Sequence, residues 1–455
     1  MSDKNKIYKP KPISGFPEWL PEERLVEQRW FDHIRRVFES YGFCSIETPS
    51  VEEIDVLLAK GEVDKEIYVL ERLHKDEDND KEARLALHFD QTVPFARYTA
   101  QHFNELTFPF KRYQMQRVWR GERPQMGRMR EFYQCDIDII NVDNLPLSFD
   151  AEVASVMYEV IAGLGVGKVQ MRISNRKILI GYLKTLGLNT TSSVLSAVDK
   201  LEKAGLEQTE IQIGLDLKLD NVENFLEIAE NIIELVTIKS SPEEFSGLLR
   251  DFITRNDVIA RSDSDAAIQN LNEGIEELQS VLDSLSHLPE GAVVADLSIV
   301  RGLDYYTGTV YETQLLEVPE FTGSVCSGGR YDDLAGGYIN KKLPGVGISL
   351  GFSRLFDVIR QSRPDLLNIG AKCPTDILVY TEDKDINANI TAQTLRKRGF
   401  NVEVFDTVKK WDKHFKYAEK KGIPYIWYIS NAGHEVKNLA SDVKEKSNPE
   451  SWSKP

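Results

Sequence analysis

Cysteine is scarce in this sequence of 455 residues, and long apolar runs are missing from it. The four cysteines, Cys44, Cys135, Cys326 and Cys373, lie far apart and form no Cys-x-x-Cys pair. We therefore expect reduced thiols and no metal site, because zinc sites and disulfide frameworks need closely grouped cysteines. No apolar run approaches the roughly 18 residues of a membrane span, so no membrane partner is expected. The N-terminal segment lacks an apolar signal-peptide core, which predicts a cytoplasmic protein.

Basic residues are fewer than acidic ones. The chain has 56 Lys and Arg against 72 Asp and Glu, a net charge of −16. This balance argues against binding nucleic acid through the whole surface, but it permits a local basic patch. Hydrophobic residues at 41% and charged residues at 28% are typical of globular domains, so the chain has enough apolar residues for a large core. The length predicts two to four domains.

Changes in composition along the chain predict five segments. Proline-bearing polar residues open the chain, strands and helices follow, and a leucine-rich helical stretch interrupts them. A later alternation of strands and helices is typical of a small α/β domain. We predict an N-terminal arm at 1–20, one domain of strands and helices at 21–175 and 296–362, a helical insertion at 176–295, an α/β domain at 373–440, and a polar tail at 441–455.

The segment 110–140 has the densest chemical pattern. It is predicted as a strand, a loop with two glycines and a proline, and a returning strand. The loop holds Arg120, Arg123, Arg128 and Arg130. Guanidinium groups match the geometry of phosphate, so four of them around one turn indicate a nucleotide or RNA phosphate site. A solvated, charged hairpin is the alternative.

The returning strand carries Gln134, Asp136 and Asp138 at alternate positions, so all three side chains point to one face. Ionisable groups beside isoleucines are costly to bury without partners. A pocket for a cationic or hydrogen-bonding substrate explains them, and exposure on an open sheet face is the alternative.

Residues 85–94 are predicted as a strand that delivers Asp90 and Thr92 to one place, where a carboxylate and a hydroxyl suit an ammonium group. A helix N-cap before Phe95 is the alternative. His88 is interpreted as a solvated or hydrogen-bonded strand residue.

Two later stretches place glycine beside polar and aromatic residues. One is Arg301 to Glu312, with adjacent Tyr305 and Tyr306, and the other is Cys326 to Leu334. Glycine allows close approach of the backbone to a ligand, and tyrosine gives an apolar wall with a polar tip. An aromatic β-hairpin is the alternative for the first stretch. A helix at 411–421 interleaves lysines with aromatic residues, which fits an RNA-facing element or a solvated face.

In this order, the segments resemble histidyl-tRNA synthetases, a family of class II aminoacyl-tRNA synthetases. The helix that leads to Pro49, the segment 110–140, and Gly351 to Arg354 are similar to the three class motifs. Arg301 to Tyr306 and Ser327 to Asp332 are similar to two signatures of the histidine enzymes. The resemblance implies an α+β fold: a class II catalytic domain built on an antiparallel sheet, with a helical insertion, and a C-terminal α/β anticodon-binding domain.

The resemblance also implies site residues. Arg301 and Arg120 are expected to be catalytic, with Arg301 supplying positive charge at the α-phosphate. Histidine is expected to contact Asp90, Gln91, Thr92, Arg120, Gln134, Asp138, Arg301, Tyr305 and Tyr306. ATP is expected to contact Arg120, Glu122, Arg128, Phe132 and Arg354. The acceptor end of the transfer RNA is assigned to Arg123 and Gln125.

The implied reaction is the ATP-dependent ligation of L-histidine to tRNA(His) through a histidyl-adenylate, releasing AMP and pyrophosphate. A homodimer is implied, as is Mg²⁺ on the pyrophosphate portion of ATP. The alternatives are a histidine-binding regulatory subunit without aminoacylation activity and a class II synthetase for another amino acid. The chain departs from common family patterns at His88, where arginine is frequent, and at Asp90 and Asp138, where glutamate is frequent.

Overall fold

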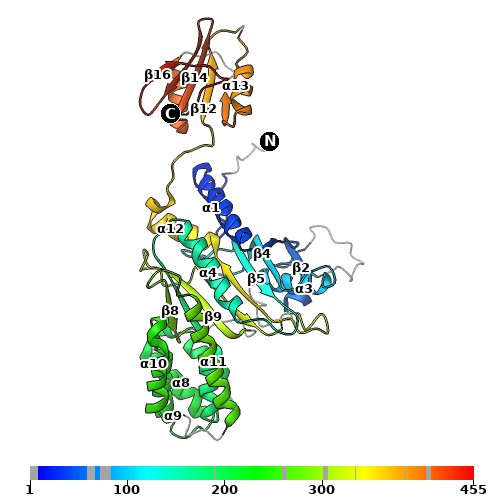
Figure 1. The fold of residues 1–455 in the computed structure, drawn as a ribbon, viewed down its shortest axis with the longest axis vertical. Coiled ribbons are helices and arrows are strands. Elements are labelled where there is room, and N and C mark those ends of the chain that lie inside the picture. The colour runs from blue at the N-terminus through cyan, green and yellow to red at the C-terminus, as the bar shows by residue number, and fades with distance from the viewer. Residues whose placement is uncertain are drawn as a thin grey trace, which may run out of the picture. The chain divides into compact units, whose positions relative to one another are not determined.

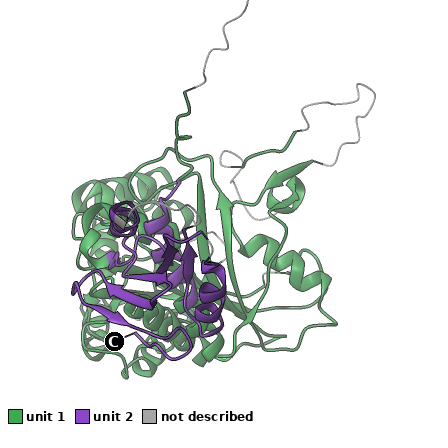
Figure 2. Ribbon diagram, turned by 90° about the horizontal axis from the view of Figure 1, so that it is seen from above, with its two compact units in different colours: residues 1–17, 33–366 green, residues 18–32, 367–455 purple. Residues whose placement is uncertain are grey.

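The computed structural model describes residues 9–58, 67–71, 84–188, 191–258, 264–300, 306–333, 335–384, 386–405 and 411–454. The chain folds into two compact units. The first unit comprises residues 1–17 and 33–366, and the second comprises residues 18–32 and 367–455 (Figure 2). Among the described helices, none combines the length and the apolar character that a bilayer crossing requires.

The first unit is built on a nine-stranded sheet (Figure 1). Its strands, in spatial order, are β1 (Cys44–Ser45), β4 (Phe110–Trp119), β5 (Glu131–Ile140), β11 (Gly345–Leu350), β10 (Cys326–Tyr331), β9 (Tyr306–Leu315), β6 (Val169–Asn175), β8 (Val293–Asp296) and β7 (Lys239–Ser240). Neighbours are antiparallel except at β1–β4 and β6–β8. This sheet confirms the predicted α+β fold with an antiparallel catalytic sheet.

Helices cover the apolar face of the sheet. They are α4 (Ser148–Gly163) and α12 (Phe352–Ser362), and the last turns of α1 (Pro21–Ser40) contact β4, where the rings of Phe38 and Tyr113 lie 5.6 Å apart. The register aligns Ile137 with Ile348, and these residues share their face with Tyr311. The Tyr311 hydroxyl donates to the carbonyl of Asp150 in α4. Since side chains alternate between the faces of a strand, the polar residues of β5 lie on the opposite face.

Most of the remaining helices of the first unit lie between β6 and β8 in the chain. They are α5 (Arg176–Thr185), α6 (Thr191–Val198), α7 (Leu201–Ala204), α8 (Leu206–Leu219), α9 (Phe225–Val236), α10 (Pro242–Arg255) and α11 (Asp265–Ser284). A Cβ atom on Gly181 would lie 2.7 Å from the backbone of Leu271, so glycine allows α5 and α11 to pack closely. The same stretch of chain contributes β7 and part of β8 to the sheet, which its helical periodicity does not predict.

The predicted strand at 85–94 is wrong beyond its first residues. The structure has β2 (Val51–Glu53), α2 (Ile54–Leu58), β3 (Leu85–Leu87) and α3 (Thr92–Gln101) in this region. Asp90 Oδ1 accepts a hydrogen bond of 3.2 Å from the backbone N–H of Val93. Pro94 lies in the first turn of α3, where no intrahelical N–H donor is needed. The start of a helix, which was the alternative, is therefore correct.

The second unit contains a five-stranded sheet, and its strand–helix alternation confirms the predicted α/β architecture. The strand order is β13 (Val402–Val404), β12 (Ile377–Thr381), β14 (Tyr425–Ser430), β15 (Gly433–Asn438) and β16 (Lys444–Lys446). The helices are α13 (Ala388–Lys397) and α14 (Trp411–Lys421).

Two sequence interpretations of the second unit need correction. The described residues of the predicted polar tail at 441–455, which are 441–454, are folded onto the unit, because β16 extends the sheet and Trp452 is 7% exposed, with its ring 5.7 Å from that of Trp427. In α14, Phe415 and Tyr417 pack against the core, so these aromatic rings do not form an exposed face with the lysines.

Candidate active site

A continuous polar face crosses the centre of the large sheet. The register of β4 and β5 aligns Arg112 with Asp138, Gln114 with Asp136, and Gln116 with Gln134. On the other side of β5, Asp136 is aligned with Ser349 of β11 and Asp138 with Gly347. Gln134, Asp136 and Asp138 therefore share one face, as predicted. All three are at most 9% exposed, so the alternative of an open, solvated face is wrong.

A cavity of about 270 Å³ opens over this face. All five predicted ATP-binding residues line it, and so does Gln134, which together with Arg120 is predicted to bind histidine. They are Arg120, Glu122, Arg128, Phe132, Arg354 and Gln134. These side chains come from the 110–140 hairpin and from the first turn of α12, more than 200 residues later in the chain. The structure thus brings together the two separate stretches that the sequence analysis selected.

Aromatic and carbonyl contacts fix the position of Arg120. Its guanidinium carbon lies 5.2 Å from the centroid of the Phe132 ring, and its Nε donates to the Phe89 carbonyl at 3.0 Å. Neither partner neutralises the charge, so a cation remains at the wall of the cavity. Arg128 differs, because its Nε lies 2.9 Å from Glu122 Oε2. A phosphate that binds Arg128 must therefore share or displace this ion pair.

Arg354 connects α12 to the arginine-bearing loop. It donates from Nε to the Gly127 carbonyl at 2.9 Å, and from a terminal nitrogen to the Ser324 carbonyl at 2.8 Å. The Gly127 N–H donates to Asp357 Oδ2 at 3.1 Å. Gly127 has φ of +67°, and an added Cβ would lie 3.0 Å from Val358. Glycine is required there by both conformation and space.

Three carboxylates are buried beside the cavity around one buried arginine. Asp138 accepts a hydrogen bond of 3.0 Å from the Tyr331 hydroxyl and pairs with Arg112, whose guanidinium lies 4.4 Å from the Phe95 ring centroid. Burial raises the pKa of Asp90 to about 6 and that of Asp136 to about 7. Burial also raises the pKa of Asp138, although Arg112 and Tyr331 oppose this shift. The environment therefore favours an additional positive charge.

Unpaired acceptors indicate where such a charge would bind. Around this cluster, four buried side-chain oxygens have no hydrogen-bond donor among the described residues: Asp90 Oδ2, Gln91 Oε1, Gln134 Oε1 and Asp136 Oδ1. Buried polar groups are normally paired, and an ammonium group brings three N–H donors to acceptors of this kind. This region of the site is therefore suited to a small cationic ligand.

The remaining predicted histidine-binding residues differ in their surroundings. Gln91 Nε2 donates to the carbonyls of Gln116 and Gln134, at 3.0 and 3.1 Å, which anchors α3 to the sheet. Thr92 is the first residue of α3. Tyr306 packs against the hydrophobic cluster that contains Tyr331. Arg301 and Tyr305 lie outside the described residues.

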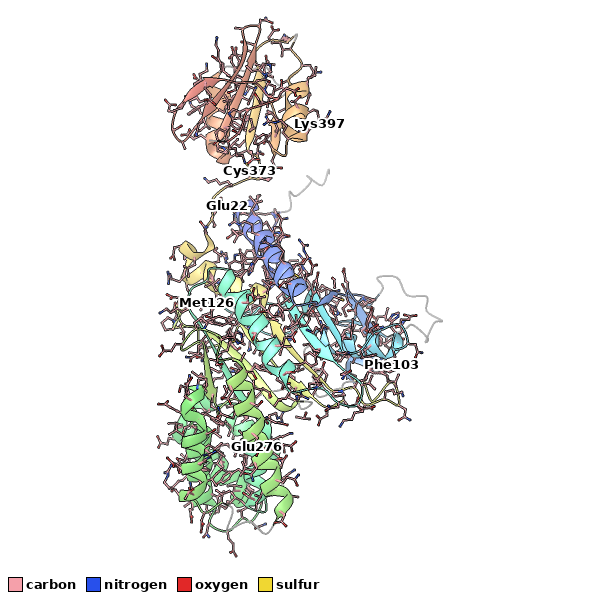
Figure 3. All side chains as sticks on the ribbon, in the orientation of Figure 1. Glu22, Phe103, Met126, Glu276, Cys373 and Lys397 are labelled. Carbon is pink, nitrogen blue, oxygen red and sulfur yellow. The ribbon has the colours of Figure 1, made fainter. Side chains whose placement is uncertain are left out.

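The loop residues assigned to the transfer RNA are on the surface. Arg123 and Gln125 are both exposed, and so is Met126, which is labelled in Figure 3. Gln125 and Arg128 exchange two backbone hydrogen bonds of 3.0 and 2.8 Å, which form a tight turn at the loop tip. His88 is fully buried, and its Nε2 lies 2.7 Å from the Arg117 carbonyl. His88 is thus hydrogen-bonded through Nε2, but it follows β3 instead of lying within it, and its Nδ1 has no partner among the described residues.

Sequence reasoning missed three residues of this site: Arg112, Tyr331 and Ser349. Arg112 had a detectable signal, because Arg112, Gln114 and Gln116 alternate on β4 as the acids do on β5. Tyr331 lies in a stretch already selected for its glycines, without a role of its own. Ser349 had no local signal, because its partner Gln134 is 215 residues away.

Comparison with solved structures places this fold among known ones. The chain is similar to the crystal structure of histidyl-tRNA synthetase from Nostoc sp. PCC 7120, with a TM-score of 0.83, 35% identity, and coverage of 97% of each chain. A structure from Bacillus halodurans C described as an ATP phosphoribosyltransferase regulatory subunit/histidyl-tRNA synthetase has 19% identity and a TM-score of 0.69, a likeness in fold alone. The fold is that of an aminoacyl-tRNA synthetase with an antiparallel catalytic sheet.

Sequence comparison identifies the family. The family model described as histidyl-tRNA synthetase matches residues 15–355, and an anticodon binding domain matches residues 376–439. The histidine--tRNA ligase of Thermobifida fusca (strain YX) is 49% identical over 98% of this chain and 99% of its own length. This chain belongs to the histidyl-tRNA synthetase family.

Proposed function

We propose that this protein ligates L-histidine to tRNA(His) in an ATP-dependent reaction that proceeds through a histidyl-adenylate. The observation that supports this proposal best is the adjacency of two oppositely charged halves of one site. An arginine-lined cavity suits the phosphates of ATP, and a buried carboxylate cluster beside it suits the ammonium and imidazole of histidine. Gln134 belongs to both halves, because it lines the cavity and shares a face with Asp136 and Asp138.

ATP is assigned to the cavity side chains. Phe132 and Arg354 enclose the adenine through stacking and cation–π contact. Glu122 accepts from the adenine amine, and Arg128 contacts the terminal phosphates. Arg120, whose charge is not neutralised by Phe89 or Phe132, lies between the histidine carboxylate and the α-phosphate.

Histidine is assigned to the buried cluster. Its α-ammonium binds Asp90, Thr92 and Gln134, with Gln91 beside them, and its imidazole lies between Asp138 and Tyr306, with Tyr305 shaping the wall. A carboxylate on one ring nitrogen and a phenol on the other select a ring with two polar edges, because other side chains leave buried groups unpaired. Asp138 is shorter than glutamate, yet it is held in place by Arg112 and Tyr331.

Adenylate formation needs no nucleophilic side chain. The histidine carboxylate attacks the α-phosphorus in line, the bond to the bridging oxygen breaks, and pyrophosphate leaves with that electron pair. The protein contributes position and charge, from Arg120 and from the proposed catalytic residue Arg301. Mg²⁺ enters as part of the substrate, bound to the pyrophosphate oxygens of ATP, the hard ligands that this cation prefers. A terminal hydroxyl of the transfer RNA then takes the acyl group, and AMP leaves.

The other assignments follow the predicted domain layout. Residues 21–175 and 296–362 form the catalytic domain, 176–295 the helical insertion and 373–440 the anticodon-binding domain. The exposed Arg123 and Gln125 contact the acceptor end. A homodimer forms through the segment from α1 to Pro49, which includes the edge strand β1. We place the reaction in the cytoplasm, where transfer RNA is charged.

ATP–pyrophosphate exchange with each amino acid tests this proposal. We expect exchange that depends on histidine and on no other amino acid. Exchange with threonine or proline would instead support a synthetase of another specificity. An absence of exchange combined with histidine binding would support the regulatory subunit.

Arg301 has its own test. Arg301→Ala is expected to abolish adenylate formation while histidine binding persists in part, because the α-phosphate loses a positive charge. Retained exchange near the unmodified rate would remove Arg301 from its role. Arg123→Ala is a useful comparison, since its assigned contact is with the transfer RNA and exchange should continue without it.

A further inference from the structure

Ser349 connects two polar residues of the buried face. The register pairs Ser349 of β11 with Asp136 of β5, and Gln134 is the diagonal neighbour. Gln134 Nε2 donates to Ser349 Oγ at 2.8 Å, and Ser349, the cross-strand partner of Asp136, acts to lower the pKa of the Asp136 carboxyl, which burial raises. Ser349 lines the cavity, whereas Gln134 and Asp136 are at least nine-tenths buried. The three side chains form a chain of neighbours, from Gln134 through Ser349 to Asp136, at the junction of both ligand regions.

The number of available hydrogens fixes the direction of this chain. A serine hydroxyl has one hydrogen, and an ionised carboxylate only accepts. Because Ser349 Oγ accepts from Gln134 Nε2, the hydrogen of its hydroxyl is free to be donated to the Asp136 carboxylate, its cross-strand neighbour. The amide of Gln134 must present its nitrogen to Ser349, so its oxygen points elsewhere. That oxygen, Gln134 Oε1, is buried and meets no donor among the described residues.

We propose that Asp136 and Ser349 are positioning residues, which orient the Gln134 amide so that Oε1 accepts a hydrogen bond from the α-ammonium of the bound amino acid. This inference rests on the proposed function and adds to it the group that sets the polarity of Gln134. Without this chain the amide can turn through half a rotation, which places an N–H donor where the ammonium needs an acceptor. A turned amide therefore weakens the binding of ligands that carry the ammonium group.

The protonation of Asp136 acts through the same chain. A protonated carboxyl can donate to Ser349, which then turns its hydrogen toward Gln134 and favours the opposite orientation of the amide. Burial raises the pKa of Asp136 to about 7, while Arg112 opposes this shift and Asp138 and Asp90 add to it. Above a pH of about 7, Asp136 is therefore ionised, and Ser349 donates to Asp136 and accepts from Gln134.

The experiment compares two ligands that differ only in the amino group, L-histidine and 3-(imidazol-4-yl)propionate. Dissociation constants are measured by calorimetry for the full-length protein and for Ser349→Ala. Loss of one charge-assisted hydrogen bond predicts that the variant binds histidine roughly tenfold to thirtyfold more weakly. Binding of the des-amino ligand is expected to change by less than about twofold. The KM for histidine should rise while the KM for ATP stays constant.

Three further variants separate positioning from structural damage. Ser349→Thr keeps a hydroxyl and is expected to restore most of the discrimination. Asp136→Asn keeps the volume but removes the obligatory acceptor, so it should weaken histidine binding in the same selective way. Ser155→Ala removes a buried hydroxyl of α4 that donates to Ala151, outside the cavity, and should leave both ligands unaffected. Thermal melting of each variant confirms folding.

Different results would overturn the inference. Equal weakening of both ligands in Ser349→Ala, or no weakening of either, would contradict a role in orienting Gln134. Failure of Ser349→Thr to restore discrimination in a folded protein would do the same. An unmodified protein that binds histidine no better than the des-amino ligand would also contradict it, even if exchange activity is present. An unmodified protein without histidine binding or exchange would reject the proposed function as well.

Discussion

The two halves of the proposed site are built in opposite ways. The cavity half uses arginines on a loop, held by carbonyl groups and an aromatic ring, and its ion pair of Arg128 and Glu122 is partly exposed. The other half uses carboxylates on a rigid sheet, buried so completely that the pKa values of Asp90, Asp136 and Asp138 are raised. Each half therefore complements the charge of its proposed ligand. The cavity half keeps a guanidinium charge for the phosphates of ATP, and the carboxylate half keeps unpaired oxygen atoms for the ammonium group of histidine.

The largest expected effect is on the cavity half. Arg120→Ala should reduce kcat/KM for histidine-dependent pyrophosphate exchange by about 10³-fold, because it removes a donor aimed at charge in the transition state. Arg120→Lys keeps the positive charge but loses the two-pronged guanidinium, so its kcat/KM should lie between those of the unmodified protein and Arg120→Ala. Steady-state exchange kinetics at saturating ATP measure both variants. A loss below tenfold for alanine would show that Arg120 does not contact the reacting phosphate.

A second large effect is expected in the carboxylate half. Asp138→Asn leaves Arg112 buried without its ionic partner, so the free energy of unfolding should fall by about 3 kcal/mol. The KM for histidine should rise by about 100-fold, since the asparagine amide no longer offers a carboxylate to the imidazole. Denaturant unfolding and exchange kinetics measure the two effects separately. A stable variant with an unchanged KM would argue against both contacts of Asp138.

The comparison also predicts a dependence on pH that is confined to the carboxylate half. The folded-state pKa values of Asp90 and Asp136, about 6 and about 7, exceed the ordinary value of 3.8. The unliganded protein therefore holds protons that the unfolded chain has lost, and its stability falls as pH rises from about 4 to about 7. A bound ammonium offsets this loss, so the rise in melting temperature caused by histidine should increase between pH 6 and pH 8.

Asp136→Asn is the control for this pH dependence, because titration of the free histidine imidazole is the same for both proteins. The increase in histidine-induced melting temperature between pH 6 and pH 8 should be smaller in the variant, since one of the two carboxyls with a raised pKa is gone. Stabilisation by ATP alone should vary less over the same pH range, because the cavity arginines stay charged. An equal pH dependence for histidine in both proteins would remove Asp136 from this account.

The smallest effect on adenylate formation is expected from the second unit. Trp452→Ala removes a buried ring from a core that includes Trp427, and it should destabilise that unit by about 3 kcal/mol. Exchange activity should change by less than about twofold, because the proposed reacting groups belong to the first unit. Charging of transfer RNA should fall further than exchange. A parallel loss of both activities would contradict this separation.

Local patterns predicted the parts of the fold whose signals lie close together in the chain. The strands at 110–119 and 131–140 and the shared face of Gln134, Asp136 and Asp138 follow from alternation and turn residues. The end of β3 and the start of α3 were not predicted. The residues before Pro94 have strand character in the sequence, and the hydrogen bond from the Val93 N–H to Asp90 at the start of α3 is visible only in the structure.

Long-range contacts set the limit of sequence reasoning. Arg354 meets Gly127 across 227 residues, and Ser349 meets Gln134 across 215. No periodicity indicates such pairs, because they depend on the spatial order of the strands in the sheet. Trp452 is a similar case: a single aromatic residue among polar neighbours gives no repeating pattern, although it completes a core. The roles of the paired site residues came from the resemblance to the family.

A crystal structure of the protein with L-histidine and a non-hydrolysable ATP analogue tests the division of the site most directly. The predicted result places adenine between Phe132 and Arg354, the α-phosphate at Arg120, the imidazole beside Asp138, and the α-ammonium within hydrogen-bond distance of Gln134 Oε1. Histidine bound away from the carboxylate cluster, or a nucleotide bound outside the arginine-lined cavity, would contradict the assignment of the two halves.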